Sequence, residues 1–486
     1  MQSSKLSRFL YAFLAVGAAG ILIIIWLFAA RSYAGIFTSA RLIFLIVSLV
    51  LAAAVILAGS RLRWGNGLSD RAFVLLAVIL TLTTRLFWVL AVDTAPFSDF
   101  LHMHNYGVAV SRGDFTNYVD FYSCFPFKFG FGFLVGGLYA LFGANPLVVQ
   151  LFNVFLSLVQ VLFVYLIARE IEPGSARPAV LFYALWPAQI MYCSVVAAEN
   201  SFLVPFLAAI YVLVIFSRRH AGSPKGYALL VLAGALTAIA QAMRPMAMVL
   251  VPAAAVCILF FIPRRGPKGR DIAQKAFCVV LAALSYFAVL KLASIPIKEL
   301  SGIDITRSGS GYNFLVGTNY EANGMFNQED FSIIAKYDFD FDRVHSEAQK
   351  LAIQRIREDP ARFLKLMVKK TNYQWGKEDY GYYWSIISAE GGGRLEEFIK
   401  LHPRYFYAGS QLFYLVILFL AAAGCYAAYR RKTMAPALFW LVIGAMFLAY
   451  CFLEVQSRYH MPAVPLFIML AGLGAAEIKG MMPGKK

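Results

Sequence analysis

The sequence has 486 residues, of which 60% are hydrophobic and only 15% are charged, and its mean hydropathy is +0.66. Soluble globular proteins carry nearer one quarter charged residues, so this composition excludes an ordinary soluble protein and predicts an integral membrane protein. The formal net charge of +17 does not indicate a nucleic-acid partner, because membrane proteins concentrate Lys and Arg in their cytoplasmic loops.

A membrane-spanning helix needs about 20 apolar residues, and this criterion predicts twelve spans. They lie at residues 9–30, 41–59, 72–92, 146–168, 177–195, 200–217, 226–243, 245–263, 274–294, 409–429, 435–453 and 461–477. The first span has a basic flank, Lys5 and Arg8, as a signal peptide would have. Its apolar run is longer than a signal core, so we expect a retained helix.

A short apolar segment, residues 129–143, decides the predicted topology. If it does not span, the basic loops after it all lie on the side of the N-terminus, as the positive-inside rule requires. If it spans, every later basic loop moves to the opposite face. We therefore predict a re-entrant or juxtamembrane helix at 129–143, cytoplasmic termini, and polar segments that return to one extracytoplasmic face of the plasma (inner) membrane.

Four regions follow from this topology. They are an added N-terminal helix pair (1–71), a transmembrane core (72–294) with an outer loop (93–145), an extracytoplasmic loop region (295–406), and the C-terminal transmembrane helices (407–486). Within the loop region, residues 341–358 form an amphipathic run, and Pro360 suits the first turn of a following helix. Its basic and aromatic content is typical of an interfacial helix.

The first candidate site residues follow the third predicted span. Asp93, Asp99, His102 and Tyr106 lie there within fourteen residues. An aspartate beside a membrane span is costly unless it is solvated or functional. Either aspartate could be a solvated loop acid or a helix cap; the functional interpretation makes Asp99, or Asp93 beside it, a general base that activates an acceptor hydroxyl.

Three isolated charges interrupt the apolar runs. Glu199 is either a capping acid for the helix that begins near Ser201 or part of a site. Arg244 needs an anionic partner, either a carboxylate such as Glu199 or a phosphate. Arg85, inside the third span, either reaches toward the surface or pairs with an acid.

A polar turn at residues 454–462 carries Arg458 and His460, within reach of a lipid phosphate by topology, or else serves as an interfacial anchor. The turn-rich loop at 311–324 carries Asn313 and Asn319, whose amides could face a sugar.

The sequence contains no Walker motif, no GxGxxG after a strand and no HExxH, so soluble nucleotide chemistry is not supported. Its six cysteines show no CxxC or metal-ligand spacing.

In their order, these features resemble the GT-C superfamily of polyprenyl-phosphate-sugar-dependent glycosyltransferases, of the glycosyltransferase family 39 type. The most similar members are bacterial protein-mannosyltransferase-like and aminoarabinose-transferase-like enzymes. The resemblance covers about residues 72–477. It rests on residues 96–100 with Tyr106, 141–143, Glu199, Arg244 with Pro245, 313–319 with Gly324, 359–363 and 458–465.

The resemblance implies an all-α polytopic GT-C-like fold of about 12 transmembrane helices with outer juxtamembrane helices. It implies an inverting transfer from a polyprenyl-phosphate (undecaprenyl-phosphate) sugar to an acceptor hydroxyl, with Asp99 as base. Donor-phosphate contacts would come from Arg244, Arg458, Lys128 and His460; Glu199, His102, Tyr106, Asn313 and Asn319 would line the substrate or metal region. A divalent cation at Glu199 and Asp99 is permitted but not required.

The resemblance leaves the acceptor open among a glycan, a lipid and a protein. The Asp-Glu pair of eukaryotic protein mannosyltransferases is absent, because Phe100 follows Asp99. Two other functions compete with it: a secondary transporter or lipid-linked-sugar flippase, and a surface-glycan polymerase or ligase. The transporter is disfavoured because the sequence lacks paired discontinuous helices in matching halves.

Overall fold

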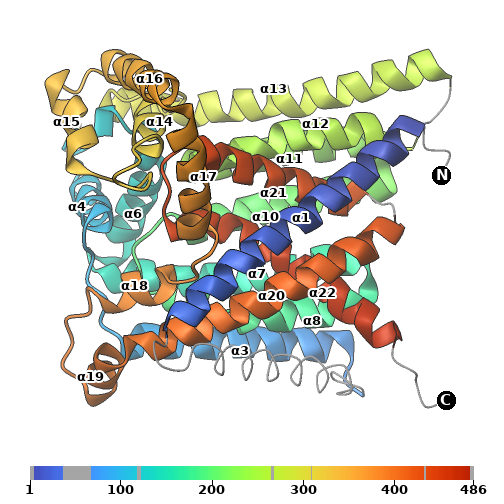
Figure 1. The fold of residues 1–486 in the computed structure, drawn as a ribbon, viewed down its shortest axis with the longest axis horizontal. Helices are drawn as coiled ribbons and strands as arrows, with labels where there is room; N and C mark the ends of the chain where they lie inside the picture. Colours follow the sequence, from blue (N-terminus) through green and yellow to red (C-terminus); the bar gives the residue numbers. More distant parts are fainter. Residues whose placement is uncertain are drawn as a thin grey trace.

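The computed structural model describes residues 5–36, 67–117, 122–263, 267–307, 309–431 and 434–481, which form helices and their connections (Figure 1). Within these ranges, nine helices are long and apolar enough to cross a membrane. They are α1 (Lys5–Ile36), α3 (Asp70–Ala91), α7 (Pro146–Ile171), α10 (Glu199–Ile215) with its extension η2 (Phe216–His220), α11 (Pro224–Met243), α13 (Lys268–Ser301), α20 (Pro403–Arg431), α21 (Met434–Phe452), and η4 (Ser457–Ala463) with α22 (Val464–Met481). The chain is a multi-pass membrane protein, as its composition predicts.

Two of the predicted spans are wrong as continuous long helices, and a third, 41–59, lies outside the described residues. Segment 177–195 is broken into α8 (Pro173–Ala184) and α9 (Pro187–Tyr192), because Pro187 forces Trp186 out of the helical region (φ −65°, ψ 105°). Segment 245–263 forms η3 (Pro245–Val249) and α12 (Leu250–Phe261), which together are shorter than a spanning helix. In both places a proline marks the interruption.

Arg85 stabilises the break between α8 and α9. It is fully buried on α3 and so does not reach the surface, and within the described part of the chain it forms no ion pair with an acid. Its guanidinium donates to the carbonyl oxygens of Ala184 (2.7 Å) and Tyr183 (3.0 Å) and to the Gln189 side chain (2.7 Å). At the break the Tyr183 carbonyl oxygen also accepts a longer bond from the Trp186 amide at 3.3 Å, and the arginine supplies the shorter bonds to both carbonyls inside the apolar bundle.

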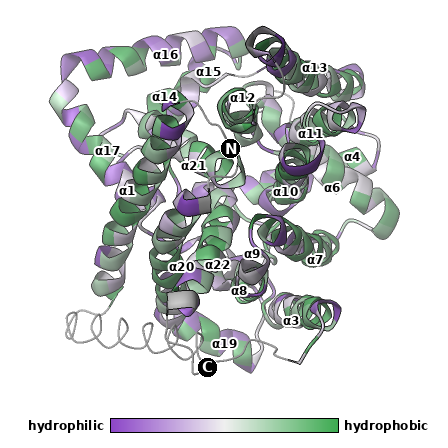
Figure 2. Ribbon diagram, turned by 90° about the vertical axis from the view of Figure 1, so that its right-hand side faces the viewer, coloured by the Kyte–Doolittle hydropathy of each residue, from purple (hydrophilic) through white to green (hydrophobic). Residues whose placement is uncertain are grey.

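Short helices gather at one end of the bundle (Figure 1). Two of them, α4 (Asp99–Ser111) and α6 (Phe129–Phe142), lie in the predicted outer loop, with the turn η1 (Pro126–Lys128) directly before α6. The others are α14 (Gly311–Gly317), α15 (Gln328–Lys336), α16 (Phe341–Glu358), α17 (Pro360–Gln374), α18 (Tyr380–Ile386) and α19 (Arg394–Leu401). The sequence therefore predicted correctly the bounds of α16 and the start of α17 at Pro360. Hydrophilic residues are frequent along α16, whereas hydrophobic residues dominate the long helices (Figure 2).

Helix α6 is the segment that the sequence predicts to be juxtamembrane. Its glycines allow it to pack closely against its neighbours at this end of the bundle. A Cβ atom at Gly130 would lie 1.9 Å from the Ala242 carbonyl oxygen of α11, and one at Gly136 would lie 2.2 Å from Val110 of α4. Neither approach is possible with a side chain. The glycine-rich composition therefore fixes α6, and with it the preceding Lys128, against α4 and α11.

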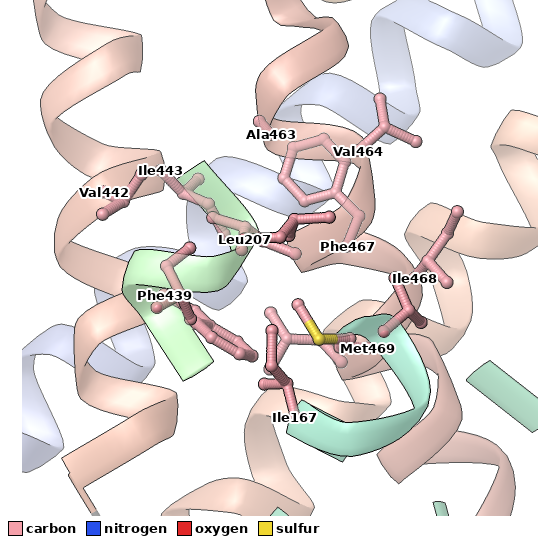
Figure 3. Packing of buried hydrophobic residues seen from close by; sticks show 14 of the residues in the cluster. Ile167, Leu207, Phe439, Val442, Ile443, Ala463, Val464, Phe467, Ile468 and Met469 are labelled. Atoms are coloured by element: carbon pink, nitrogen blue, oxygen red, sulfur yellow. The ribbon is translucent and has the colours of Figure 1, made fainter. Parts of the chain in front are cut away.

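The main core lies between the long helices and is almost wholly apolar (Figure 3). Labelled side chains from four helices meet there, including Ile167 of α7, Leu207 of α10, Phe439 of α21 and Met469 of α22, all fully buried. Helix α22 is more deeply buried than α1 or α13. It therefore forms the centre of the bundle, and the turn η4 directly before it is held in a fixed position.

We expect Arg85→Met to destabilise the protein strongly. The substitution keeps a long side chain but leaves two buried carbonyls and the Gln189 amide without their donor, at a cost of about 2–4 kcal/mol. The measurement is thermal unfolding of the purified protein in detergent. Arg71→Met is the control, because Arg71 is exposed on the same helix; equal melting temperatures for the two variants would contradict the assigned role.

Candidate functional site

A cavity of about 310 Å³ lies at the end of the bundle where the short helices gather. Its charged lining residues come from five places in the sequence: Asp99, Lys128, Glu199, Arg244, and the turn that carries both Glu454 and Arg458. Aromatic side chains form much of the remaining wall: Phe100, Phe125, Phe127, Phe131, Tyr312, Phe326, Phe331, Trp384, Tyr450 and Tyr459. The cavity thus combines three cations, three carboxylates and aromatic surface.

Asp99 lies at the entrance to helix α4. Ser98 before it has φ of 55° and ψ of −133°, an unfavourable conformation for a residue other than glycine, and this sharp turn starts α4 at the aspartate. The carboxylate Oδ2 lies 3.6 Å from Lys128 Nζ and 3.5 Å from an Arg458 guanidinium nitrogen. The nearby Lys128 ammonium is the main cause that lowers the pKa of Asp99 to about 2; burial opposes it, and Arg458 and His102 add to it.

Glu454 lies in the turn between α21 and η4, and its pKa is shifted in the opposite direction to that of Asp99. Burial, followed by repulsion from the Asp99 carboxylate, raises the pKa of Glu454 to about 7, although Arg458 and Lys128 oppose the rise. Its Oε1 accepts weak hydrogen bonds from Gln456 and Tyr459, both at 3.5 Å. Two neighbouring carboxylates therefore hold protons very differently near neutral pH, an arrangement common in sites that move protons.

Two arginines lie on the inner side of the cavity. Arg244, at the end of α11, forms an ion pair with the buried Glu199 at the start of α10, and its guanidinium lies 5.3 Å from the Tyr459 ring centre. Arg458 stacks over Phe100 and Trp384 at 4.7 and 5.2 Å. A guanidinium has five N–H donors, and among the described residues Arg458 donates a hydrogen bond only to Asp99, at 3.5 Å. Arg458 thus keeps donors for an anionic ligand.

Backbone hydrogen bonds to α14 and to the turn after it hold the turn that carries Glu454. The Glu454 amide donates to the Asn313 carbonyl oxygen at 2.7 Å, and the Val455 amide donates to the Gly324 carbonyl oxygen at 2.9 Å. Asn313 itself lines the cavity. Its segment had been expected to face a sugar through its amides; the structure adds that its carbonyls position Glu454.

A buried lysine completes this support. Lys370 of α17 donates to the carbonyl oxygens of Gly317 (2.8 Å) and Cys451 (2.9 Å), at the ends of α14 and α21. Burial lowers the pKa of Lys370 to about 7. A Cβ atom at Gly317 would lie 2.1 Å from the Phe452 carbonyl oxygen, so only glycine permits this approach. The end of α21, and hence Glu454, is thereby fixed.

The structure brings together six of the predicted site residues at the cavity: Asp99, Lys128, Glu199, Arg244, Asn313 and Arg458. Arg244 has the carboxylate partner that the sequence left open. Glu199 is the first residue of α10 and pairs across to Arg244, rather than capping a helix that begins at Ser201.

Five predicted residues do not line the cavity. Asp93 is exposed beside α19, where its backbone amide donates to Glu396. Tyr106 is buried on α4, and its hydroxyl donates to the Phe115 carbonyl oxygen at 3.1 Å. Asn319 donates to Asp330 at 3.0 Å within the loop region. His102 follows Asp99 by one helical turn, and its charge helps to lower the pKa of Asp99.

His460 is the clearest correction. It is completely buried, and its Nε2 lies 2.6 Å from Glu378 Oε2, with its ring stacked on Trp375 and Tyr414. This position contradicts the predicted contact with a donor phosphate. The short η4 turn directs Arg458 toward the cavity and His460, two residues later, into the core. The histidine instead ties the segment after α17 to the bundle.

The residues present do not fit a metal site. In the ranges that the structure describes, no group of three His, Cys, Asp or Glu side chains is close enough to hold a metal ion. The two carboxylates expected as metal ligands each have cationic partners: Glu199 pairs with Arg244, and Asp99 with Lys128 and Arg458.

Sequence reasoning missed the role of Glu454. Glu454 is the first charge of the polar turn at 454–462, in which the predicted site residues are Arg458 and His460. A carboxylate immediately after an apolar span carries the same cost that singled out Glu199. Glu454 and Asp99 are 355 residues apart in the sequence, so their interaction follows only from the tertiary structure.

We expect the two carboxylates to titrate as a coupled pair. The wild type should show a carboxyl group that loses its proton near pH 7 in infrared titration, and this band should vanish in Glu454→Gln. In Asp99→Asn the Glu454 pKa should fall, because a neighbouring negative charge has been removed. Glu396→Gln, a buried acid outside the cavity, is the control. A band unaffected by Asp99→Asn would contradict the coupling.

Comparison with known proteins gives one family match. Residues 128–291 match the sequence model of the family described as Dolichyl-phosphate-mannose-protein mannosyltransferase. This segment contains Lys128, Glu199 and Arg244 of the cavity. No curated protein matches the chain.

Several solved structures are similar in arrangement. An oligosaccharyltransferase of Archaeoglobus fulgidus, AglB in complex with an inhibitory peptide and a dolichol-phosphate, is 13% identical, with a TM-score of 0.45, over 83% of this chain and 50% of that one. The same organism's oligosaccharyltransferase with Zn and sulfate is 15% identical, with a TM-score of 0.44, over 83% and 48%. ArnT from Cupriavidus metallidurans, bound to undecaprenyl phosphate, is 13% identical, with a TM-score of 0.32, over 85% and 79%.

The chain spans about half the length of the oligosaccharyltransferases that it matches. The TM-scores all lie below 0.5, so these likenesses carry no argument about the site. The family match at residues 128–291 does bear on the chain, because it coincides with part of the region where the motifs resemble known enzymes. The matched residues lie within residues 72–477, where the motifs resemble the GT-C superfamily.

Proposed function

We propose that the protein moves a sugar from a polyprenyl-phosphate donor to an acceptor hydroxyl, with inversion at the anomeric carbon and with Asp99 as the general base. The observation that carries this proposal is the cavity in which Asp99 lies 3.6 Å from Lys128 and 3.5 Å from Arg458, with Arg244 on the same wall. The matched family, described as Dolichyl-phosphate-mannose-protein mannosyltransferase, supports a lipid-phosphate sugar as donor.

The cations supply the donor site. A sugar phosphate linked to a lipid carries negative charge on its phosphate, and Lys128, Arg244 and Arg458 are the cations that line the cavity. Arginine offers paired donors that match phosphate oxygens, and lysine adds a point charge. These groups would hold the phosphate before reaction and stabilise the charge that collects on it as the sugar leaves.

The transfer itself requires one bond to form and one to break. The acceptor oxygen forms a bond to the anomeric carbon while the bond from that carbon to the phosphate oxygen breaks. The electron pair of the broken bond stays on the phosphate, and the hydroxyl proton passes to the Asp99 carboxylate. Attack on the face opposite the leaving phosphate inverts the anomeric configuration.

Binding of the donor would prepare Asp99 for this role. Its low pKa keeps it ionised at any physiological pH, and that low value comes mainly from Lys128. A phosphate that engages Lys128 and Arg458 would offset part of their charge, so the basicity of Asp99 would rise when the donor is in place. The base would thus be strengthened by the substrate itself.

The positive-inside pattern supports an extracytoplasmic site. The polar end of the bundle carries this cavity, while the predicted cytoplasmic loops carry the clusters of Lys and Arg. The donor sugar would therefore reach the cavity after transfer of its lipid carrier across the membrane. The aromatic walls suit a sugar ring or a polyprenyl chain, and the acceptor is a glycan, lipid or protein hydroxyl.

The first test is transfer by the purified protein in nanodiscs, with a panel of radiolabelled polyprenyl-phosphate sugars and a crude cell-envelope acceptor. Asp99→Asn should lower kcat by about 10²–10⁴-fold, the usual contribution of a general base. Asp114→Asn is the matched control, because Asp114 is exposed at the other end of α4. Asp93→Asn should also remain close to wild type, since Asp93 lies outside the cavity.

Two outcomes would contradict the proposal. Full activity in Asp99→Asn would remove the base role from that residue. No transfer from any donor, together with movement of the lipid-linked sugar across the bilayer, would favour the alternative function of a transporter or flippase.

The pH dependence of donor binding gives a second test. Because its pKa is raised to about 7, Glu454 is neutral below this pH and negatively charged above it. The added negative charge should repel the donor phosphate, so the donor KM should rise as pH increases through 7 while kcat changes little. In Glu454→Gln this rise should disappear. If instead kcat rises through pH 7 and is lost in Glu454→Gln, the base is Glu454 and not Asp99.

A further inference from the structure

A second, larger cavity of about 700 Å³ lies between the end of α1, the C-terminal half of α17 and the start of α20. It shares no lining residue with the cavity around Asp99. Helix α17 separates the two: Lys370 supports the turn that carries Glu454, whereas Val368, Lys369, Asn372 and Tyr373 line the second cavity. One wall of the second cavity is α1, which precedes the region of resemblance at about residues 72–477.

The charged residues that line this second cavity are all cations. Its lining includes four cations, Arg31 of α1, Lys369 of α17, Lys377 after α17 and Arg404 of α20, and no carboxylate. Among the described residues, none of the four forms an ion pair with an acid. Asp379, which lies close to Lys377 in the sequence, interacts with it electrostatically.

Gathering four like charges in a hollow is unfavourable unless an anion occupies it. The cations come from three separate segments, namely the end of α1, the end of α17 with the residues after it, and the start of α20, so no single helix requires the cluster. The ammonium groups of Lys377 and Lys369 lie over the rings of Tyr373 (4.4 Å) and Tyr320 (3.7 Å), which holds them without neutralising them. Ser32 and Asn372, which are in contact at 3.4 Å, add polar groups to the same wall.

The rest of the lining favours a lipid over a free anion. Phe28, Ile36, Val368 and Pro403 give it an apolar part, and Tyr382 stacks on Tyr407 with 5.3 Å between ring centres. Two of its walls, α1 and α20, are candidate membrane spans, and the cavity lies at their ends. Side chains of α1 such as Phe13 and Leu27 are exposed and suit contact with acyl chains. Phosphate headgroups lie at this level of a bilayer.

We propose that this cavity binds the phosphate headgroup of an anionic membrane lipid, with Arg31, Lys369, Lys377 and Arg404 around the phosphate and the apolar lining against the first part of the lipid chains. The site goes beyond the transfer reaction and does not depend on it. A bound lipid would link α1 to α17 and α20 by neutralising charges that otherwise repel one another.

The test is lipid binding by the full-length protein in mild detergent, measured by native mass spectrometry with dioleoylphosphatidic acid as probe. Wild type should retain one phosphatidate and prefer it to dioleoylphosphatidylcholine. Lys377→Gln/Arg404→Gln should weaken phosphatidate binding by about thirtyfold, because each cation near a membrane surface contributes roughly fivefold. Inorganic phosphate at millimolar concentration should not displace the lipid.

Two control variants separate charge from folding. Arg357→Gln/Lys365→Gln removes the same charge from exposed positions that line neither cavity, and it should bind phosphatidate as wild type does. Lys377→Arg/Arg404→Lys keeps both charges and should retain binding within about threefold. Equal binding by the glutamine pair and wild type, equal retention of the two lipids, or complete displacement by inorganic phosphate would each overturn the proposal.

Discussion

The attraction between the Asp99 carboxylate and its two cations is the interaction on which the described site depends. Lys128 approaches it from the turn before α6, and Arg458 approaches from the turn before α22. All three groups lie at the end of an apolar bundle, where an isolated charge would be costly. Each charge is therefore stabilised only when the three segments are correctly placed, so the assembly of the cavity and the packing of the helices are coupled.

The same charges separate the behaviour of the two carboxylates. Asp99 lies closer to Lys128 and has its pKa lowered, whereas Glu454, buried and beside the Asp99 charge, has its pKa raised. Their difference therefore arises from position and not from residue type. It gives the cavity one permanent negative charge and one that changes near neutral pH, a property that would control how strongly an anionic donor is held.

Backbone interruptions bring polar groups into an otherwise apolar bundle. Pro187 divides the predicted span into α8 and α9, and Arg85 donates to two backbone carbonyls at the break. Gly130 and Gly317 let backbones approach where no side chain could fit. These positions are costly in isolation, and the surrounding helices compensate for them. The geometry of Lys128 and Glu454 depends on two such close approaches.

The sequence by itself determined that the chain is a multi-pass helical membrane protein, because long apolar runs and low charge have no other stable arrangement. It also selected Asp99, Glu199 and Arg244 as charges at the ends of apolar runs and Arg458 as a charge in a polar turn, whereas Lys128 came from the resemblance to known enzymes. Only the tertiary structure decided which of the polar residues meet. It placed Glu454 beside Asp99 and turned His460 into the core, because two residues along a short turn reverse the direction of a side chain. It likewise gathered the four cations of the second cavity from three separate segments, which no local pattern relates.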